Sequence, residues 1–239
     1  MPRFFIDAPA SDFISVTGSD ARHIGYSLRM KIGDPITFCH GGTDYLCVIE
    51  SMTENEVLCR VESSVPSKSE PTVQLTLYQA YPKQDKLELI IQKTTELGVT
   101  RIVPFTSSRC VARPDEKSYR KKQERYCRIA EEAAKQSGRG IVPEIAPLMT
   151  MKEALEDMKG CGTRLFCYEN GGERLTAEVL PQEGNIGVMI GSEGGFERGE
   201  AEAAEAAGAR QIWLGERILR CETCPIAVTA IIMNLTGNM

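Results

Sequence analysis

A glycine-rich stretch at residues 190–200, IGSEGGFERGE, is the first segment whose residue types could do chemistry. It follows the apolar run 185–191 and precedes an acidic, helix-like stretch. A turn of this kind between a parallel strand and a helix lets the backbone approach a nucleotide-like ligand closely. A tight turn with no ligand is the alternative that this segment alone leaves open. The glycine spacing does not match the GxGxxG fingerprint of dinucleotide-binding proteins, and no Gly-Lys-Ser/Thr follows, as a phosphate-binding P-loop requires. A nucleophile elbow is also excluded, because Ile190 occupies the first glycine position of GxSxG.

Residues 214–223, LGERILRCET, form the second such segment, between a predicted strand and the last predicted helix. Two arginines and two glutamates at the carboxyl end of a strand are costly to hold together unless they pair or meet a ligand. The alternative is that Glu222 favours the helix start and Arg220 simply pairs with it.

The nine cysteines and two histidines predict no metal site. Cys221 and Cys224 form a CxxC pair, but Cys161 and Cys167 do not supply a second pair at zinc-binding spacing, so we expect packing. Cysteines 39, 47, 59 and 167 lie in apolar runs and are expected to be small buried hydrophobes. The odd cysteine count and the absence of an export signal predict a reduced, cytoplasmic protein.

The elements that must position these segments divide into two predicted domains, residues 1–68 and 72–239. The first contains short strands around one helix, 19–30, and reads as a small β-barrel. Residues 63–72 are polar, contain two prolines and are predicted to be the linker. Strands then alternate with helices, which predicts an α/β domain with a parallel sheet covered on both faces. The predicted helices of this second domain are 85–97, 116–137, 151–158, 197–207 and 223–235.

Charge is distributed unevenly along the chain. The formal net charge is −5, so the whole molecule is not a basic nucleic-acid binder, and no apolar run is long enough to span a membrane. Residues 101–139, however, hold eleven Lys/Arg against five acids, a net charge of +6. On helix 116–137 we expect Tyr119, Tyr126, Ile129, Ala130 and Ala133 to share the buried face. The opposite, basic face is a candidate surface for RNA, with a solvated helix face as the alternative.

Together these segments resemble the bacterial ribosomal small-subunit methyltransferase E family. The resemblance is carried by HIGYSLRMKIGD (23–34), QKTTELGV (92–99), RIAEEAAKQSGR (128–139), IGSEGGFERGE (190–200) and LGERILRCET (214–223). It implies a PUA-like β-barrel followed by a SPOUT domain with a trefoil knot, S-adenosylmethionine as the cofactor, methylation of uridine N3 in 16S rRNA of the small ribosomal subunit, and a homodimer. The family usually has proline where Ser192 stands, and alanine or threonine where Cys224 stands.

The resemblance also implies roles for individual residues. Arg220 is the expected cation that stabilises the uracil anion, with Glu193 and Glu222 as unranked candidates for the base or for orienting Arg220. The expected cofactor-binding residues are Phe166, Tyr168, Glu169, Ile190, Gly191, Ser192, Gly194, Gly195, Leu214, Gly215, Ile218 and Leu219. The expected RNA-binding residues are Arg3, His23, Arg29, Arg125, Gln136 and Arg139.

Two other functions remain open from the sequence. A non-catalytic RNA-binding protein would rely on the small β domain alone. A nucleotide-dependent enzyme acting on a small metabolite would use the glycine-rich turn, although the basic helix has no role in it.

Overall fold

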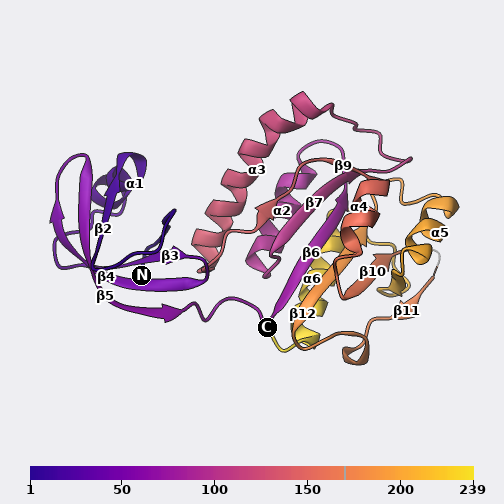
Figure 1. Ribbon diagram of the computed structural model, residues 1–239. Coiled ribbons are helices and arrows are strands. Elements are labelled where there is room, and N and C mark those ends of the chain that lie inside the picture. The colour runs from indigo at the N-terminus through magenta and orange to yellow at the C-terminus, as the bar shows by residue number, and fades with distance from the viewer. Residues whose placement is uncertain (170) are drawn as a thin grey trace. The chain divides into compact units, whose positions relative to one another are not determined.

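The structure, a computed structural model, describes residues 1–169 and 171–239. It contains two compact units, shown along the colour ramp in Figure 1. Unit 1 consists of Met1–Glu70 with Lys135–Ile141, and unit 2 of Pro71–Ala134 with Val142–Met239. Each unit has its own hydrophobic core. The last residues of the predicted helix 116–137 therefore group with the N-terminal unit, which the sequence pattern did not indicate.

Unit 1 is built on a five-stranded sheet with the order β1-β3-β4-β5-β2. The β1–β3 ladder is parallel and the others are antiparallel. The predicted helix begins as α1 (Gly18–Arg22) and continues as a π-helix, His23–Ser27. The strands are β1 (Arg3–Phe5), β2 (Phe13–Thr17), β3 (Pro35–His40), β4 (Thr43–Met52) and β5 (Glu56–Pro66).

The predicted linker is shorter than the sequence suggested. Strand β5 pairs with β4 as far as Pro66, so residues 63–66 belong to the sheet. The side chains of residues 63–66 are all exposed. Because this part of the strand buries no side chains, its composition resembles that of a linker, and the sequence pattern did not reveal the strand.

Unit 2 contains an eight-stranded sheet with the path β11-β13-β10-β12-β6-β7-β8, and β9 also pairs with β7. All ladders described for this sheet are parallel, which confirms the predicted α/β class. Side chains on both faces of the central strands are fully buried, as Leu75, Leu77 and Tyr78 illustrate. The strands are β6 (Val73–Ala80), β7 (Arg101–Thr106), β8 (Glu144–Ile145), β9 (Met149–Thr150), β10 (Thr163–Cys167), β11 (Glu173–Arg174), β12 (Gly184–Ile190) and β13 (Arg210–Trp213).

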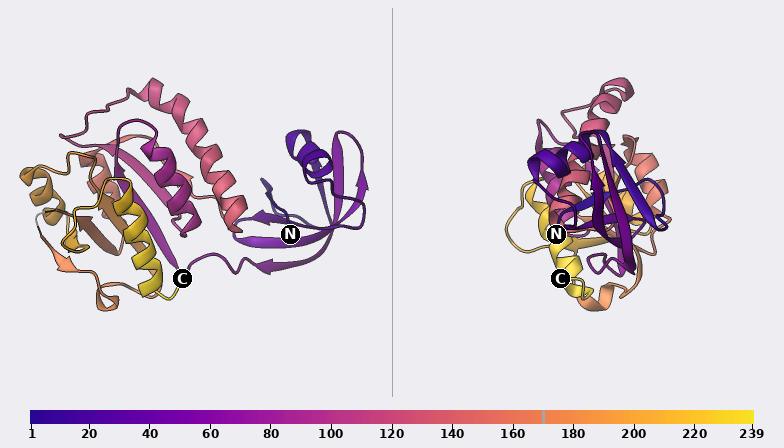
Figure 2. Two further views of the ribbon diagram at one scale, coloured as in Figure 1. Left: turned by 180° about the vertical axis from the view of Figure 1, so that it is seen from behind. Right: turned by 90° about the vertical axis from the view of Figure 1, so that its left-hand side faces the viewer.

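Helices cover both faces of this sheet. In Figure 1, α4 lies in front of the sheet, and in the left-hand view of Figure 2, from behind, α2 and α6 lie in front of it. In α2, Leu87, Ile90, Ile91 and Thr94 are buried, at the spacing of one helical face. The helices are α2 (Lys86–Glu96), α3 (Glu116–Ser137), α4 (Met151–Met158), the 3₁₀ turn Ala177–Val179, α5 (Arg198–Ala206) and α6 (Thr223–Leu235).

Helix α3 buries the apolar face that its periodicity predicts. Tyr119, Tyr126, Ala130 and Ala133 are buried and Ile129 is half-buried. Among the described residues, no helix combines the length and apolarity needed to cross a bilayer. The trefoil knot stays a prediction, because strand order does not define how the chain threads.

Each unit contains a half-buried or buried ion pair that ties distant segments together. In unit 2, Arg101 contacts both carboxylate oxygens of Asp157, at 2.6 and 3.2 Å, and the Tyr78 hydroxyl donates to the same carboxylate at 2.6 Å. In unit 1, Glu70 accepts hydrogen bonds from Nε and Nη2 of Arg139 at 2.9 and 2.7 Å. Glu70 also accepts from two backbone N–H groups beyond Arg139, so it anchors the segment after α3 to the N-terminal unit.

Candidate active site

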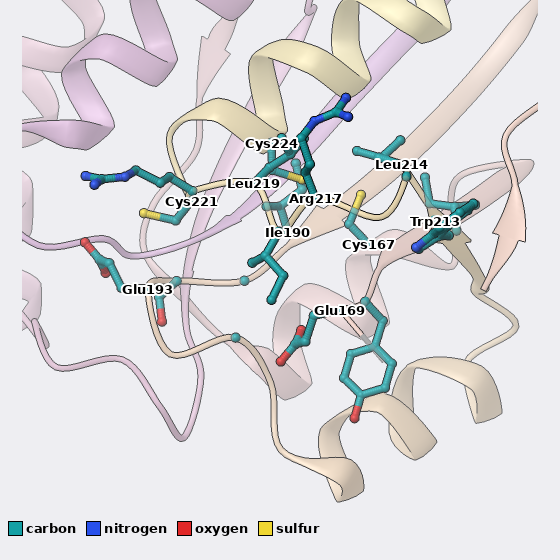
Figure 3. Close-up of a pocket in the computed structure, with 18 of the residues that line it drawn as sticks. Cys167, Glu169, Ile190, Glu193, Trp213, Leu214, Arg217, Leu219, Cys221 and Cys224 are labelled. Atoms are coloured by element: carbon teal, nitrogen blue, oxygen red, sulfur yellow. The ribbon is translucent and has the colours of Figure 1, made fainter. Parts of the chain in front are cut away.

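A pocket of about 720 Å³ opens at the carboxyl ends of β10, β12 and β13 in unit 2. In open parallel sheets this edge is where ligands bind. Three chain segments, residues 167–169, 190–195 and 212–221, supply most of the lining, and Lys86 and Cys224 complete it. Figure 3 shows Glu169 and Glu193 on different sides of this space, with Ile190 between them. Both chemistry-bearing segments of the sequence therefore meet in one pocket.

Most of the predicted cofactor-binding residues line this pocket. The exception is Phe166, whose side chain is fully buried and packs against Phe196 with a ring separation of 4.5 Å. The strand position was predicted correctly, but at this position the side chain points into the core. The predicted residues that do line the pocket are Tyr168, Glu169, Ile190, Gly191, Ser192, Gly194, Gly195, Leu214, Gly215, Ile218 and Leu219.

The glycine-rich turn after β12 leaves no room for side chains. Gly195 has φ 63°, in the left-handed region that favours glycine, and a Cβ there would collide with the carboxylate of Glu169. A Cβ on Gly194 would lie 2.9 Å from Cβ of Arg109, and one on Gly191 would lie 3.1 Å from Cα of Gly195. The turn is held from the sheet side by Gln79, whose Nε2 donates to the carbonyl of Gly191 at 3.1 Å.

Ser192 places an unsatisfied hydroxyl in the pocket lining. The residue is 6% exposed, and its Oγ has no hydrogen-bond partner within the described part of the chain. A buried hydroxyl without a partner costs free energy unless a ligand or water satisfies it. The hydroxyl of Ser192 can therefore form a hydrogen bond with a ligand at the glycine-rich turn, where the backbone can approach that ligand closely.

Lys86 joins the two candidate catalytic carboxylates. Its Nζ lies 3.0 Å from Glu193 Oε1 and 3.2 Å from Glu222 Oε2. Glu193 also accepts from the backbone N–H of Lys83 at 3.1 Å, and Cys221 Sγ donates to Glu222 at 3.2 Å. We call Lys86, Glu193, Cys221 and Glu222 the Lys86 cluster.

Interactions within the Lys86 cluster favour the charged forms of Lys86 and of both glutamates. The hydrogen bond to Glu193 raises the pKa of Lys86, burial opposes this, and Glu222 adds to the rise. Burial alone would raise the pKa of both carboxyls. Hydrogen bonds and Lys86 outweigh it, so the pKa values of Glu193 and Glu222 are lowered. Burial raises the pKa of Cys221 to about 12, which keeps that thiol neutral.

This arrangement corrects one prediction. Glu193 and Glu222 were candidates to orient Arg220, but they pair with Lys86 instead. Arg220 is exposed at the pocket lining, and its guanidinium has no ion pair with any described residue. The sequence could have indicated Lys86, because it is the first residue of α2. A cation is unfavourable at the positive end of a helix unless carboxylates compensate it.

Comparison with known proteins gives consistent results over the whole length. Residues 68–233 match the model of an RNA methyltransferase domain, and residues 16–62 match an RNA methyltransferase PUA domain. The ribosomal RNA small subunit methyltransferase E of Bacillus subtilis is 33% identical, with 97% of this chain and 96% of that protein covered. This chain belongs to the ribosomal RNA small subunit methyltransferase E family.

Solved structures of this methyltransferase family and its relatives agree in fold. The methyltransferase E of Neisseria gonorrhoeae, determined with bound S-adenosylmethionine, superposes with a TM-score of 0.88 at 30% identity, covering 98% of both chains. A Legionella pneumophila methyltransferase, also determined with the cofactor, gives a TM-score of 0.85 at 25% identity, covering 97% of this chain and 96% of that one. The PUA-like domain and the α/β methyltransferase domain are thereby confirmed.

Two of the RNA-binding residues expected from the methyltransferase E resemblance are engaged inside the protein. Arg3 donates to both carboxylate oxygens of Asp44 at 2.8 Å. Arg139 is 2% exposed and pairs with Glu70. Both guanidinium groups hold unit 1 together, so the structure does not support them as phosphate contacts.

The other four expected RNA-binding residues are exposed. His23 lies on the π-helix, Gln136 lies near the end of α3, and Arg29 has φ 53°, which is uncommon for a residue with a side chain. Arg125 is 61% exposed and pairs with Glu88 at 2.7 Å. Near Arg29 the structure adds an exposed aromatic residue that the sequence analysis did not single out, Tyr26, which is 66% exposed.

The cysteines lie mostly in the core. Cys39, Cys47 and Cys59 are buried as expected, whereas Cys167 is half-buried and lines the pocket with Cys221 and Cys224. Its hydrogen bond with Cys224, together with burial, raises the pKa of Cys167. All nine thiols are free, and the described residues contain no group of three or more His, Cys, Asp or Glu side chains arranged to hold a metal ion.

Proposed function

We propose that this chain is an S-adenosylmethionine-dependent methyltransferase that methylates N3 of a uridine in the 16S RNA of the small ribosomal subunit. The observation that carries the proposal is the pocket at the carboxyl edge of the parallel sheet. It is formed by the two motifs of the family resemblance, in a chain that aligns over 98% of its length with a methyltransferase E solved with that cofactor.

The residues present fit the cofactor. A volume of about 720 Å³ is in the range of small-molecule sites. Glycines at 191, 194 and 195 allow close approach of the backbone, and the hydroxyl of Ser192 supplies an unused hydrogen-bonding group. When bound, S-adenosylmethionine supplies a methyl group on a positively charged sulfur. The lining has three carboxylates, Glu169, Glu193 and Glu216, and three cationic side chains, Lys86, Arg217 and Arg220, so its formal charges balance.

The chain's own residues must then promote the loss of the proton from uracil N3. The nitrogen becomes a good nucleophile only as that proton leaves, and negative charge develops on the ring. Arg220, exposed at the pocket and free of carboxylate partners among the described residues, is the cation we assign to stabilise that charge. Glu193 and Glu222 are weak bases because their pKa values are lowered, which favours an electrostatic role, as partners of Lys86, over proton abstraction.

We assign RNA holding to exposed residues of both units: His23, Arg29, Arg125 and Gln136. Residues 1–68 would act mainly in RNA binding and residues 72–239 in cofactor binding, catalysis and dimerisation. A homodimer is supported by a groove of about 750 Å³ along α6, lined in part by Ala230, Ile231 and Leu235. A monomer at micromolar concentration in light scattering would contradict that assembly. We assign the protein to the cytoplasm, where ribosomes are made.

Transfer of tritium from methyl-labelled S-adenosylmethionine tests the function directly. The full chain is incubated with small ribosomal subunits, and in parallel with protein-free 16S RNA, each prepared from cells that lack the gene. We expect label in RNA with at least one of these substrates, and none with material from cells that express the protein. RNA binding without any transfer would favour a non-catalytic RNA-binding protein.

A further inference from the structure

The surface around Tyr26 on unit 1 combines exposed apolar side chains with cations. Tyr26 is 66% exposed and Ile32 is 65% exposed. Arg22, Arg29 and Lys31 are exposed as well, and none of the three forms an ion pair with a described residue. We call these five residues the Tyr26 surface. Residues 21–33 contain no acidic side chain, so the positive charge is not neutralised within its own segment.

The local backbone brings the members of the Tyr26 surface together. Arg22 is the last residue of α1, and Tyr26 follows four residues later in the π-helix, in the indigo coil of Figure 1. Residues four apart project from nearly the same side of a helix, so these two side chains are neighbours. The N–H of Met30 donates to the carbonyl of Ile24 at 3.1 Å, which keeps Arg29 beside this helix. A π-helix and a left-handed arginine are both uncommon, and such features concentrate at functional sites.

The groups next to the Tyr26 surface leave its positive charge in place. The carboxylate of Asp34 accepts a hydrogen bond from the backbone N–H of Lys31 at 2.7 Å, so it closes the turn after the segment. The other flanking acid, Asp20, lies in α1 and forms no ion pair with a described residue.

A further cation comes from the end of α3, which belongs to unit 1. The Nζ of Lys135 lies 5.8 Å from the centre of the Phe4 ring. The ring of His23, in the π-helix, lies 5.9 Å from the same ring and meets it edge-on. Lys135 is therefore close to the helix that carries Tyr26, and it extends the positive region beyond one chain segment.

An exposed aromatic ring among cations is the combination that binds single-stranded nucleic acid. The cations follow the phosphates, and bases stack on the ring. Within an RNA helix the faces of the bases are covered by their neighbours, so a protein ring reaches such a face where the base is unpaired. The Tyr26 surface also lies within residues 16–62, which match an RNA methyltransferase PUA domain.

We propose that Tyr26 stacks on an unpaired base of the substrate RNA, and that Arg22, Arg29 and Lys31 contact the phosphates beside that base. The inference rests on the proposed function. It specifies what the small domain recognises, a single-stranded segment, and it adds an aromatic contact to the polar residues assigned to RNA holding.

Filter binding with the full chain tests the stacking contact. The target is the small ribosomal subunit or protein-free 16S RNA from cells that lack the gene, whichever the wild type binds more tightly. Tyr26→Ala should weaken binding by at least about fivefold and leave the salt dependence unchanged, because no charge is lost. Tyr26→Phe keeps the ring and should bind within about twofold of the wild type. Arg22→Gln should reduce the slope of log affinity against log salt by about 0.7.

Phe13→Ala is the matched control for removal of an exposed aromatic side chain. Phe13 is 48% exposed on β2, and its cross-strand neighbour Arg60 is paired with Glu50 and Glu62. This variant should bind as the wild type does. Thermal melting checks that each variant is folded.

Three results decide between the possibilities. Binding by Tyr26→Ala within twofold of the wild type would overturn the inference, and so would an equal loss in Tyr26→Phe, since the hydroxyl would then be the group that matters. A wild type that neither binds these targets nor transfers a methyl group would instead contradict the proposed function.

Ultraviolet crosslinking of the wild type to the same target identifies the contacting molecule without any variant. Trypsin cleaves after Arg22 and Arg29, so Tyr26 falls in the peptide of residues 23–29. We expect mass spectrometry to find this peptide carrying a nucleotide. The same peptide joined to a fragment of a ribosomal protein would overturn the inference, because the Tyr26 surface would then bind protein.

Discussion

Replacing Gly195 by alanine separates the ligand-binding role of the glycine-rich turn from its contribution to stability. Gly195 has φ 63°, and a left-handed backbone costs a residue with a Cβ about 1–2 kcal/mol. The new methyl group would also collide with the carboxylate of Glu169, which is exposed and can move away at little cost. We therefore expect a destabilisation of about 1–2 kcal/mol, which for a chain of this size lowers the melting temperature by roughly 2–8 °C.

Ligand affinity should suffer more than stability. Gly195 and Glu169 both line the pocket, so the substitution reshapes the turn and displaces a wall residue at once. We expect calorimetry to show a loss of at least about tenfold in S-adenosylmethionine affinity, equivalent to about 1.4 kcal/mol, at a temperature well below the melting transition. Gly199→Ala is the matched control, because Gly199 lies in α5 without a positive φ and no atom would lie within 4 Å of its new Cβ.

The reasoning would be refuted by a Gly195→Ala variant that melts several degrees lower and yet binds the cofactor as tightly as the wild type. That result would reduce the glycine-rich segment to a tight turn with no role in ligand binding.

Three further substitutions test other parts of the structure. Arg220→Ala should lower the single-turnover methylation rate by roughly a hundredfold, with little change in the RNA affinity measured by filter binding. A lower RNA affinity with an unchanged rate would show that Arg220 only binds the RNA. Glu70→Ala leaves the buried guanidinium of Arg139 without this partner and should cost about 3 kcal/mol in urea unfolding, whereas a loss below about 1 kcal/mol would show that the pair is dispensable. Asp157 has its pKa lowered by Arg101 and Tyr78 against the effect of burial, so its contribution to stability is present above about pH 4 and is lost as the pH falls through its folded-state pKa. The urea stabilities of wild type and Asp157→Asn should therefore keep a constant gap above about pH 5 and converge only below about pH 4, and a gap that stays constant through this lower range would contradict the prediction.

Local patterns predicted the elements whose signal lies within one stretch of chain. Helices 116–137, 151–158 and 223–235 begin and end where the sequence indicated, because apolar periodicity was sustained. The pocket segments were also found, since glycine after an apolar parallel strand indicates a close backbone approach. The two-residue strands β8, β9 and β11 are too short to give a recognisable alternation.

Charge pairing was beyond the sequence. The family resemblance implied RNA contacts for Arg3 and Arg139, and nothing local revealed their ion pairs, since Asp44 and Glu70 are distant in the chain. For Lys86, its place at the start of a helix indicates that carboxylates compensate it, but not that these are Glu193 and Glu222 of the two later motifs. An ion pair depends on which segments the fold brings together, and no local periodicity reports that.

The measurement that tests the central claim most directly is mass-spectrometric mapping of methylated nucleotides in 16S RNA. The RNA is compared between cells that express the protein, cells that lack it, and cells complemented with the wild type or with Gly195→Ala. The account predicts one uridine whose N3 methyl group disappears on deletion, returns with the wild type, and returns poorly with Gly195→Ala. An unchanged set of methylated uridines in the deletion strain would contradict it.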